Sequence, residues 1–171
     1  MLTRSDIDPA KLPYDKAQII LGGTPINVAV SRTTKAPEVL FGYKVHGTQI
    51  EEEHFIDLPE GFSFEGINAE RYEPAIPLLK FPLTIGDQWS WKGDYLCAED
   101  VKMPCTAKVT VNRESLNRPG APTDTIRVDV KLSMEENASA DMTFWFAKGS
   151  GLVMRKIGQS SSREPASPVA R

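Results

Sequence analysis

The sequence predicts a mainly β fold: a strongly curved antiparallel sheet, arranged as a half-barrel or a sandwich-like meander, with at most one or two short helices. Three observations support this prediction. The 13 prolines and 12 glycines are spread along the chain and leave few uninterrupted windows long enough for a helix. Residues 125–134 alternate between polar and apolar side chains, as a strand with one buried face does. At 171 residues, the chain is long enough for one domain with its own hydrophobic core.

The N-terminal half contains four candidate strands separated by turn residues. They span residues 25–34, 37–47, 48–58 and 60–73, and glycine interrupts the last one. Residues 15–21 fit either a short strand or a helical turn. Residues 74–89 hold three prolines among apolar residues, so we expect an extended segment that Leu78, Leu79 and Phe81 pin to the core.

The C-terminal half predicts a meander of about five strands. Residues 105–115 and 123–134 both alternate, and a Pro-Gly turn signal separates them. Further along, Met142, Phe144 and Phe146 share the inward face of one strand. A Gly-Ser-Gly reversal at 149–151 precedes the last strand. With the N-terminal strands, this predicts about eight to ten strands in all.

We expect a single β domain over residues 1–158. Residues 159–171 are rich in serine and proline, a composition that predicts a disordered tail.

Composition and charge exclude several classes of function. Twenty basic and 23 acidic residues give a net charge of -3, so the chain lacks the basic excess that nucleic-acid binding needs. No run of about 18 apolar residues is present, so we expect no transmembrane segment. Residues 1–16 lack the apolar run of a signal peptide. The protein is therefore expected to be extracytoplasmic, periplasmic or secreted, if a signal has been removed, and cytoplasmic otherwise.

Cys97 and Cys105 are the two cysteines of the chain. They could face each other across a hairpin and form a disulfide, which would indicate an oxidising compartment. The alternative is two reduced thiols that pack as small hydrophobic groups.

Aromatic residues form the candidate ligand-binding set. Trp89 and Trp91 point to one face of a strand, and Tyr95 joins them if the strand continues that far. They either line an apolar pocket or pack as core. Trp145 lies on the opposite face of its strand from Phe144, so that strand is apolar on both faces. The predicted ligand-binding residues are Trp89, Trp91, Tyr95, Phe144 and Trp145.

Catalytic motifs are absent from the sequence. Glu52 and His54 share a strand face and are compatible with a metal or acid–base site. However, the run of glutamates at 51–53 is more typical of a solvated face or a protected edge strand. There is no nucleophile elbow, phosphate loop or dinucleotide fingerprint. We therefore predict no catalytic residue, no metal and no cofactor.

Two segments resemble a known group of proteins. Residues 78–93 (LLKFPLTIGDQWSWKG) and 145–156 (WFAKGSGLVMRK) resemble an uncharacterised bacterial all-β family, itself distantly similar to the periplasmic lipoprotein-carrier half-barrels. The resemblance covers about half of the chain, from Pro77 to Lys156. It implies a curved sheet, an extracytoplasmic location and a binding role, and it brings no catalytic residues.

These observations favour a non-enzymatic binding or carrier module. Its concave face would hold an apolar small molecule, a lipid or an apolar segment of a protein partner. The alternative is a cell-envelope scaffold or interaction module with a filled core, and a hydrolase is a third hypothesis. A cavity of several hundred cubic ångströms would favour the carrier, and a filled interior would favour the scaffold.

Overall fold

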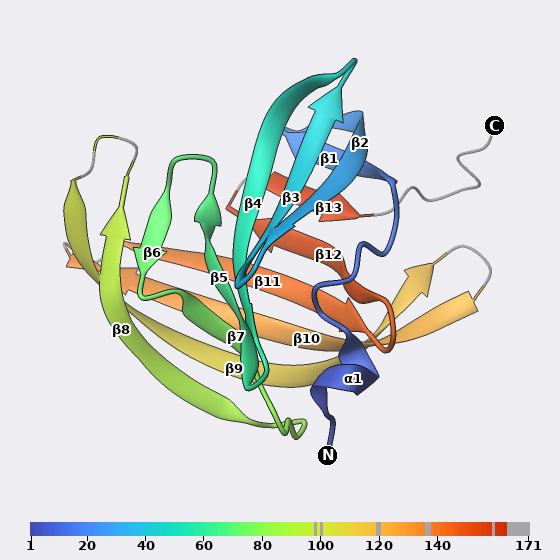
Figure 1. Ribbon diagram of the computed structural model, residues 1–171. Helices are drawn as coiled ribbons and strands as arrows, with labels where there is room; N and C mark the ends of the chain where they lie inside the picture. The colour runs from blue at the N-terminus through green and yellow to red at the C-terminus, as the bar shows by residue number, and fades with distance from the viewer. Residues whose placement is uncertain (98, 100, 119–120, 136–137, 159, 164–171) are drawn as a thin grey trace.

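The computed structural model describes residues 1–97, 99, 101–118, 121–135, 138–158 and 160–163 (Figure 1). Its elements are α1 (Arg4–Ile7), β1 (Lys16–Leu21), β2 (Thr24–Lys35), β3 (Glu38–Val45), β4 (Thr48–Leu58), β5 (Gly61–Ile67), β6 (Arg71–Glu73), β7 (Ile76–Lys80), β8 (Gln88–Leu96), β9 (Lys102–Arg118), β10 (Ala121–Met134), β11 (Ser139–Ala147), β12 (Gly151–Ile157) and β13 (Ser160–Arg163). The predicted fold class, a strongly curved antiparallel sheet with little helix, is confirmed.

The strands follow one hydrogen-bonded order that curls into two facing walls. The order is β6-β8-β9-β10-β11-β12-β13-β1-β2-β3-β4-β5-β7, and every neighbouring pair is antiparallel. In Figure 1, β8 to β12 form a curved wall below, and β1 to β5 form the wall above it.

The two ends of this order are tied together. β6 and β7 stand at opposite ends of the strand order, yet only Pro74 and Ala75 separate them in the chain. The Trp91 indole donates a hydrogen bond to the Pro74 carbonyl over 3.1 Å, and Trp89 donates to Pro77 over 3.0 Å. The sheet therefore curls until its ends meet at this link.

Phenylalanine rings fill the space between the walls. Phe55 and Phe64 of the upper wall contact Phe144 of β11, with ring centroids 6.4 and 5.3 Å apart. Phe62 meets Phe146 edge to face at 6.1 Å. All five side chains are fully buried. Since such edge-to-face and tilted contacts are the preferred packing of aromatic rings, the interior of the half-barrel is a packed core.

The N-terminal segment lies across one end of the two walls. Leu2 and Leu83 exchange backbone hydrogen bonds of 2.7 and 2.8 Å, and α1 buries Ile7 completely. The Lys11 ammonium donates to the Gly149 carbonyl over 2.9 Å. Gly151 has a φ of +76°, and a Cβ there would approach the Asp8 carbonyl oxygen to 2.8 Å. Only glycine fits this crossing without strain.

Most of the predicted strands are present, and the structure differs mainly because it divides the chain into more and shorter strands. The strand expected at 48–58 is β4. The undecided segment 15–21 is a strand, β1, and segment 60–73 divides into β5 and β6 at a turn where Asn68 has a φ of 53°. The extended segment 74–89 contributes β7 to the sheet. These divisions raise the expected eight to ten strands to thirteen.

The β domain extends beyond the predicted end at residue 158. Ser160–Arg163, expected to belong to a disordered tail, form β13, which pairs with both β1 and β12. Strand pairing uses backbone N–H and C=O groups, so a serine-rich segment can form a strand as well as an apolar one. Here β13 lies between β12 and β1, which would otherwise both be edge strands. The rest of the expected tail, residues 164–171, lies outside the described residues.

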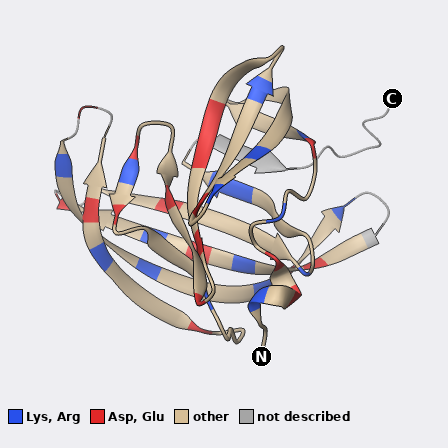
Figure 2. Ribbon diagram, viewed as in Figure 1, with Lys and Arg blue, Asp and Glu red and all other residues tan. Residues whose placement is uncertain are grey.

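A charged cluster lies inside the core and corrects the interpretation of the glutamate run. Figure 2 shows this acidic run on β4. Glu51 and Glu53 point inward and are 5% and 0% exposed, and both form ion pairs with Arg155 of β12, which is 0% exposed. The Tyr43 hydroxyl donates to Glu53 over 2.7 Å, and the guanidinium lies 5.5 Å from the centre of the Tyr43 ring.

The charges of this cluster do not balance if every group is ionised. Burial raises the pKa of Glu53 to about 8, and the Tyr43 hydrogen bond opposes this shift. One guanidinium offsets one carboxylate, so in a dry interior the second carboxyl is more stable with its proton.

Replacing Arg155 with methionine should destabilise the protein by about 3–5 kcal/mol, because two buried carboxyl groups lose their cation. The loss should be larger at pH 8 than at pH 5. The unfolded Glu53 carboxyl releases its proton above about 4.5, whereas burial holds the pKa of the folded group near 8, so stability falls as pH rises between these values. Without the Arg155 guanidinium the ionised folded carboxylate is less favourable still, so the stability of the variant falls more steeply than that of the wild type. Urea unfolding at both pH values measures this. A second variant that adds Glu53→Gln should flatten the pH dependence, and equal losses at pH 5 and pH 8 would contradict the expectation.

Candidate functional site

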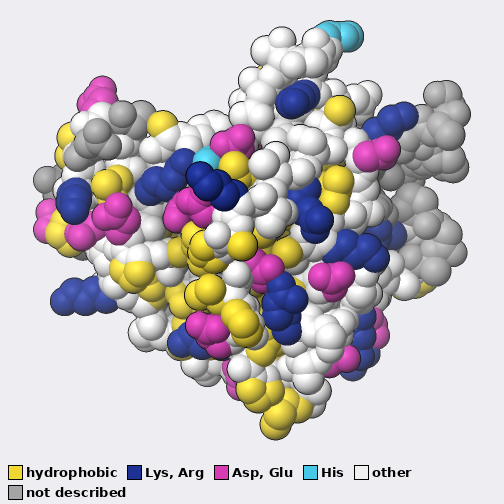
Figure 3. Space-filling view, viewed as in Figure 1, with side chains coloured by type: hydrophobic (Ala, Val, Ile, Leu, Met, Phe, Trp, Pro, Cys, Tyr) yellow, Lys and Arg dark blue, Asp and Glu magenta, His cyan; other side chains and the backbone are white. Residues whose placement is uncertain are grey.

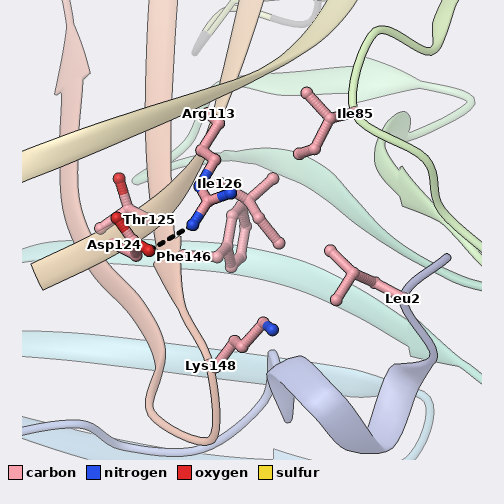
Figure 4. A pocket seen from close by; sticks show the side chains of 8 residues that line it. All are labelled: Leu2, Ile85, Arg113, Asp124, Thr125, Ile126, Phe146 and Lys148. Atoms are coloured by element: carbon pink, nitrogen blue, oxygen red, sulfur yellow. Dashed lines mark hydrogen bonds and ion pairs between the residues drawn. The ribbon is translucent and has the colours of Figure 1, made fainter.

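An apolar pocket of about 230 Å³ opens beside the N-terminal segment (Figure 4). Its floor is formed by Ile126 of β10 and Phe146 of β11, which are register partners and are both buried. Leu2 and Ile85 stand across from them. On the face seen in Figure 3, hydrophobic side chains also gather toward the end of the molecule where the chain begins.

Two cationic side chains, Arg113 and Lys148, lie at the rim of the pocket, and of these two only Arg113 forms an ion pair among the described residues. Arg113 of β9 donates to the Asp124 carboxylate, so its charge is locally compensated. Lys148 lies in the turn between β11 and β12, is exposed, and forms no ion pair within the part of the chain that the structure describes. Hydrogen bonds from Thr3, and then the charge of Lys148, lower the pKa of Asp6 in α1. The Lys148 ammonium therefore acts on this carboxylate, and because it is exposed it can also reach an acidic group bound at the pocket.

Strand alternation positions Arg113 at the pocket, and the turn before β8 positions Ile85 there. Val109 and Val111 face the core along β9, and Arg113 follows them on the same face where the strand leaves the core. The Thr84 amide donates to the Asp87 carboxylate over 2.8 Å in the turn before β8. That turn holds Ile85 outward, with 43% of its surface exposed.

The structure places the predicted ligand-binding residues in packed surroundings. β8 continues through Tyr95, so Trp89, Trp91 and Tyr95 share one face as expected. Trp91 and Phe144 belong to the main core, and Trp89 and Tyr95 pack against it. None of the five predicted residues lines the pocket of Figure 4.

Trp145 is separated from the other four residues. It lies in a small cluster on the outer face of the lower wall, with Ala147, Val153, Leu116 and Met154. The guanidinium of Arg127 lies 6.0 Å from the Trp145 ring centre, and the indole donates to Glu114. This cluster explains how β11 is apolar on both faces without a ligand.

Sequence reasoning missed the residues of the pocket. Ile126 and Phe146 lie in strands that were predicted correctly, and their inward-facing positions in the alternating pattern were the available signal. Leu2 and Ile85 carried no signal, because they come from irregular segments that meet Ile126 only after folding.

Replacing Trp91 with leucine should lower the free energy of unfolding by about 2–4 kcal/mol, because a buried indole and its hydrogen bond to Pro74 are lost. Trp89→Leu is the matched control, and it should cost less because Trp89 is only half-buried. Guanidinium unfolding measures both. Equal stability of the Trp91 variant and the wild type would mean that Trp91 is not a core residue.

The structure does not support the disulfide alternative for Cys97 and Cys105. Both are free thiols. Cys105 stands opposite Gly93, and Cys97 is four residues further along the chain, a separation of about 13 Å along a strand. A disulfide needs Cα atoms about 4.4–6.8 Å apart. The register, which the spacing in the chain does not reveal, keeps the thiols apart.

The melting temperature should therefore be the same with and without reductant. The intact mass under non-reducing conditions should equal the value for two free thiols. A mass two hydrogens lower, with a melting temperature that falls on reduction, would contradict the register between β8 and β9.

His54 lies in a polar cluster on β4. Its ring is 2.9 Å from the Glu52 carboxylate and 3.1 Å from the Arg71 guanidinium. Burial, and then the charge of Arg71, lower the pKa of His54. Within the described ranges, no group of three His, Cys, Asp or Glu side chains could hold a metal ion. The Glu52 and His54 side chains therefore meet as predicted, and the His54 ring also contacts Arg71.

The fold and the pocket define a curved antiparallel half-barrel with a packed interior and a small apolar pocket at one end. No protein-family model matches the chain, and no curated protein matches it. None of the helices in the described residues is long and apolar enough to cross a membrane.

Among solved structures, the chain is similar to the hypothetical lipoprotein YmcC from Escherichia coli. The TM-score is 0.51 at 10% identity, and the match covers 89% of this chain and 86% of that one. A chain provisionally described as a lipoprotein, from Parabacteroides distasonis, matches with a TM-score of 0.45 at 10% identity, over 90% of this chain and 95% of that one. At 10% identity, the likeness to the Escherichia coli protein shows the fold alone. It is consistent with the expected resemblance to an uncharacterised bacterial all-β family.

Proposed function

We propose that the protein is a non-enzymatic binding module that takes a short apolar group, linked to an acidic group, into the pocket above Ile126 and Phe146. The observation that carries this proposal is the pairing of an apolar floor with the ammonium of Lys148 at the rim.

The size of the pocket limits the ligand. An apolar cavity of about 150 Å³ is enough for benzene, whereas sites for whole drug-sized ligands are about 300–1,000 Å³. At about 230 Å³, the pocket fits a short alkyl chain or one large apolar side chain of a partner. A complete lipid is too large for it. The proposal therefore keeps the predicted apolar ligand and moves its site from the concave face to the end of the half-barrel.

The charges at the rim favour an acidic ligand. Arg113 already compensates Asp124, so a new anion gains little from the Arg113 guanidinium. Lys148 lies next to the apolar floor and is exposed, so its ammonium can reach a carboxylate without a large desolvation cost.

The filled interior favours a second candidate, an interaction module. The phenylalanine core leaves the concave face occupied by the protein itself, as expected for a scaffold. On this reading, the group in the pocket is an apolar side chain of a protein partner next to an acidic residue.

Octanoate and 1-octanol are suitable probes for the pocket. Octanoate should bind and shift the NMR methyl signals of Ile126, Ile85 and Leu2. Lys148→Gln should weaken octanoate binding roughly two- to fivefold, as expected for one exposed charge pair, and should leave octanol binding unchanged. Lys156→Gln, an exposed lysine on β12, is the matched control and should change neither.

Ile85→Asp tests the apolar wall. It should weaken both probes, and octanoate more strongly, because it places a carboxylate beside the ligand. The absence of saturable methyl shifts in the wild type, or equal affinity of the Lys148 variant for octanoate, would overturn the proposal.

A further inference from the structure

A second surface stands out on the outer face of β8, β9 and β10. We call it the lysine hollow, a shallow depression of about 460 Å³. Figure 2 shows basic bands on these three neighbouring strands. Its exposed side chains are three lysines and three hydroxyl residues: Lys92, Lys108, Lys131, Ser90, Thr106 and Ser133.

The strand register brings the lysines together. Lys108 of β9 stands directly opposite Lys131 of β10. Lys92 of β8 stands opposite Thr106, two positions from Lys108 on the same face. Directly opposite residues have Cβ atoms about 4.5–5.5 Å apart, and diagonal neighbours are about 7–8 Å apart. The three ammonium groups therefore share a compact area.

This arrangement is unfavourable in the absence of an anion, because like charges directly opposite on neighbouring strands destabilise a sheet. Arg127, elsewhere on the outer face, is compensated, because it pairs with Asp129 at 3.0 Å and with Glu114 at 3.6 Å. None of the three lysines has an ion pair among the described residues. Asp141 stands opposite Lys131 on β11 but lies outside ion-pair distance.

Size and charge point to a compact anion. Recognition of an anionic membrane typically uses about 4–8 basic residues in a cluster, and nucleic-acid binding needs a broader basic surface than a chain of net charge -3 provides. Three lysines with three hydroxyl donors match one doubly or multiply charged oxyanion, since each ammonium and hydroxyl can donate to its oxygens.

We propose that the lysine hollow is a binding site for the phosphate or diphosphate group of a small-molecule ligand. The site lies on the outer face of the lower wall, so it is independent of the apolar pocket and goes beyond the function proposed above.

The test is a titration with inorganic pyrophosphate at constant ionic strength, followed by NMR shifts of β8 to β10 and by the melting temperature. Pyrophosphate should bind saturably and raise the melting temperature. Lys131→Gln should weaken binding at least fivefold, and it should raise the melting temperature of the free protein because the repulsion with Lys108 is removed. Asp141→Asn should strengthen binding. Lys35→Gln, an exposed lysine on β2, is the control and should change neither quantity.

Several results would overturn the proposal. These are the absence of saturable shifts, an equal affinity of the Lys131 variant, or an equal effect of sodium chloride at the same ionic strength. Vesicles that contain phosphatidylglycerol provide a further arm. Binding to the vesicles without binding of pyrophosphate would assign the lysine hollow to a membrane surface and reject the small-molecule ligand. An NMR spectrum that is unchanged away from the substituted residue shows that each variant is folded. The Lys131 variant and the wild-type protein should also respond to octanoate in the same way, which keeps this test separate from that of the pocket.

Discussion

Arg155 connects the two walls of the half-barrel, and the packing around it depends on this connection. Its guanidinium leaves β12 in the lower wall and pairs with Glu51 and Glu53 on β4 in the upper wall. Because water does not reach these groups, an unmatched charge there is costly, and other pairings of the walls would leave one. We infer that the cluster selects this arrangement of the walls among alternatives that bury similar apolar area.

The phenylalanine core follows from that arrangement. Once β4 and β5 face β11, the inward rings of the two walls meet in tilted and edge-to-face contacts and fill the interior. The closing of the sheet at Pro74 removes the remaining space on that side. Space for a ligand is left where the walls end, between the inward faces of β10 and β11 and the N-terminal segment. The position of the pocket is thus a consequence of a core that is packed elsewhere.

The two faces of the lower wall carry different kinds of side chain. Alternate residues of β8 to β10 point into the core, and the residues between them form an outer face with paired charges in one region and three lysines in another. The apolar pocket and the lysine hollow use opposite faces of the same strands, so a ligand at one leaves the other accessible. A rigid, hydrogen-bonded sheet is a suitable support for both, because it holds side chains at fixed spacing.

The sequence by itself determined the β class, the bounds of β4 and the inward face of β11, because strand alternation depends only on neighbouring residues. The tertiary structure decided the features that join distant segments. Glu51 and Glu53 are buried because Arg155, 102 residues beyond Glu53, meets them. The cysteines stay apart because the register of β8 and β9 places Gly93, not Cys97, opposite Cys105. Leu2 and Ile85 become pocket walls only when the ends of the strands meet. Local sequence patterns do not specify which distant segment a strand or a charged side chain contacts, because packing and desolvation across the whole fold determine those contacts.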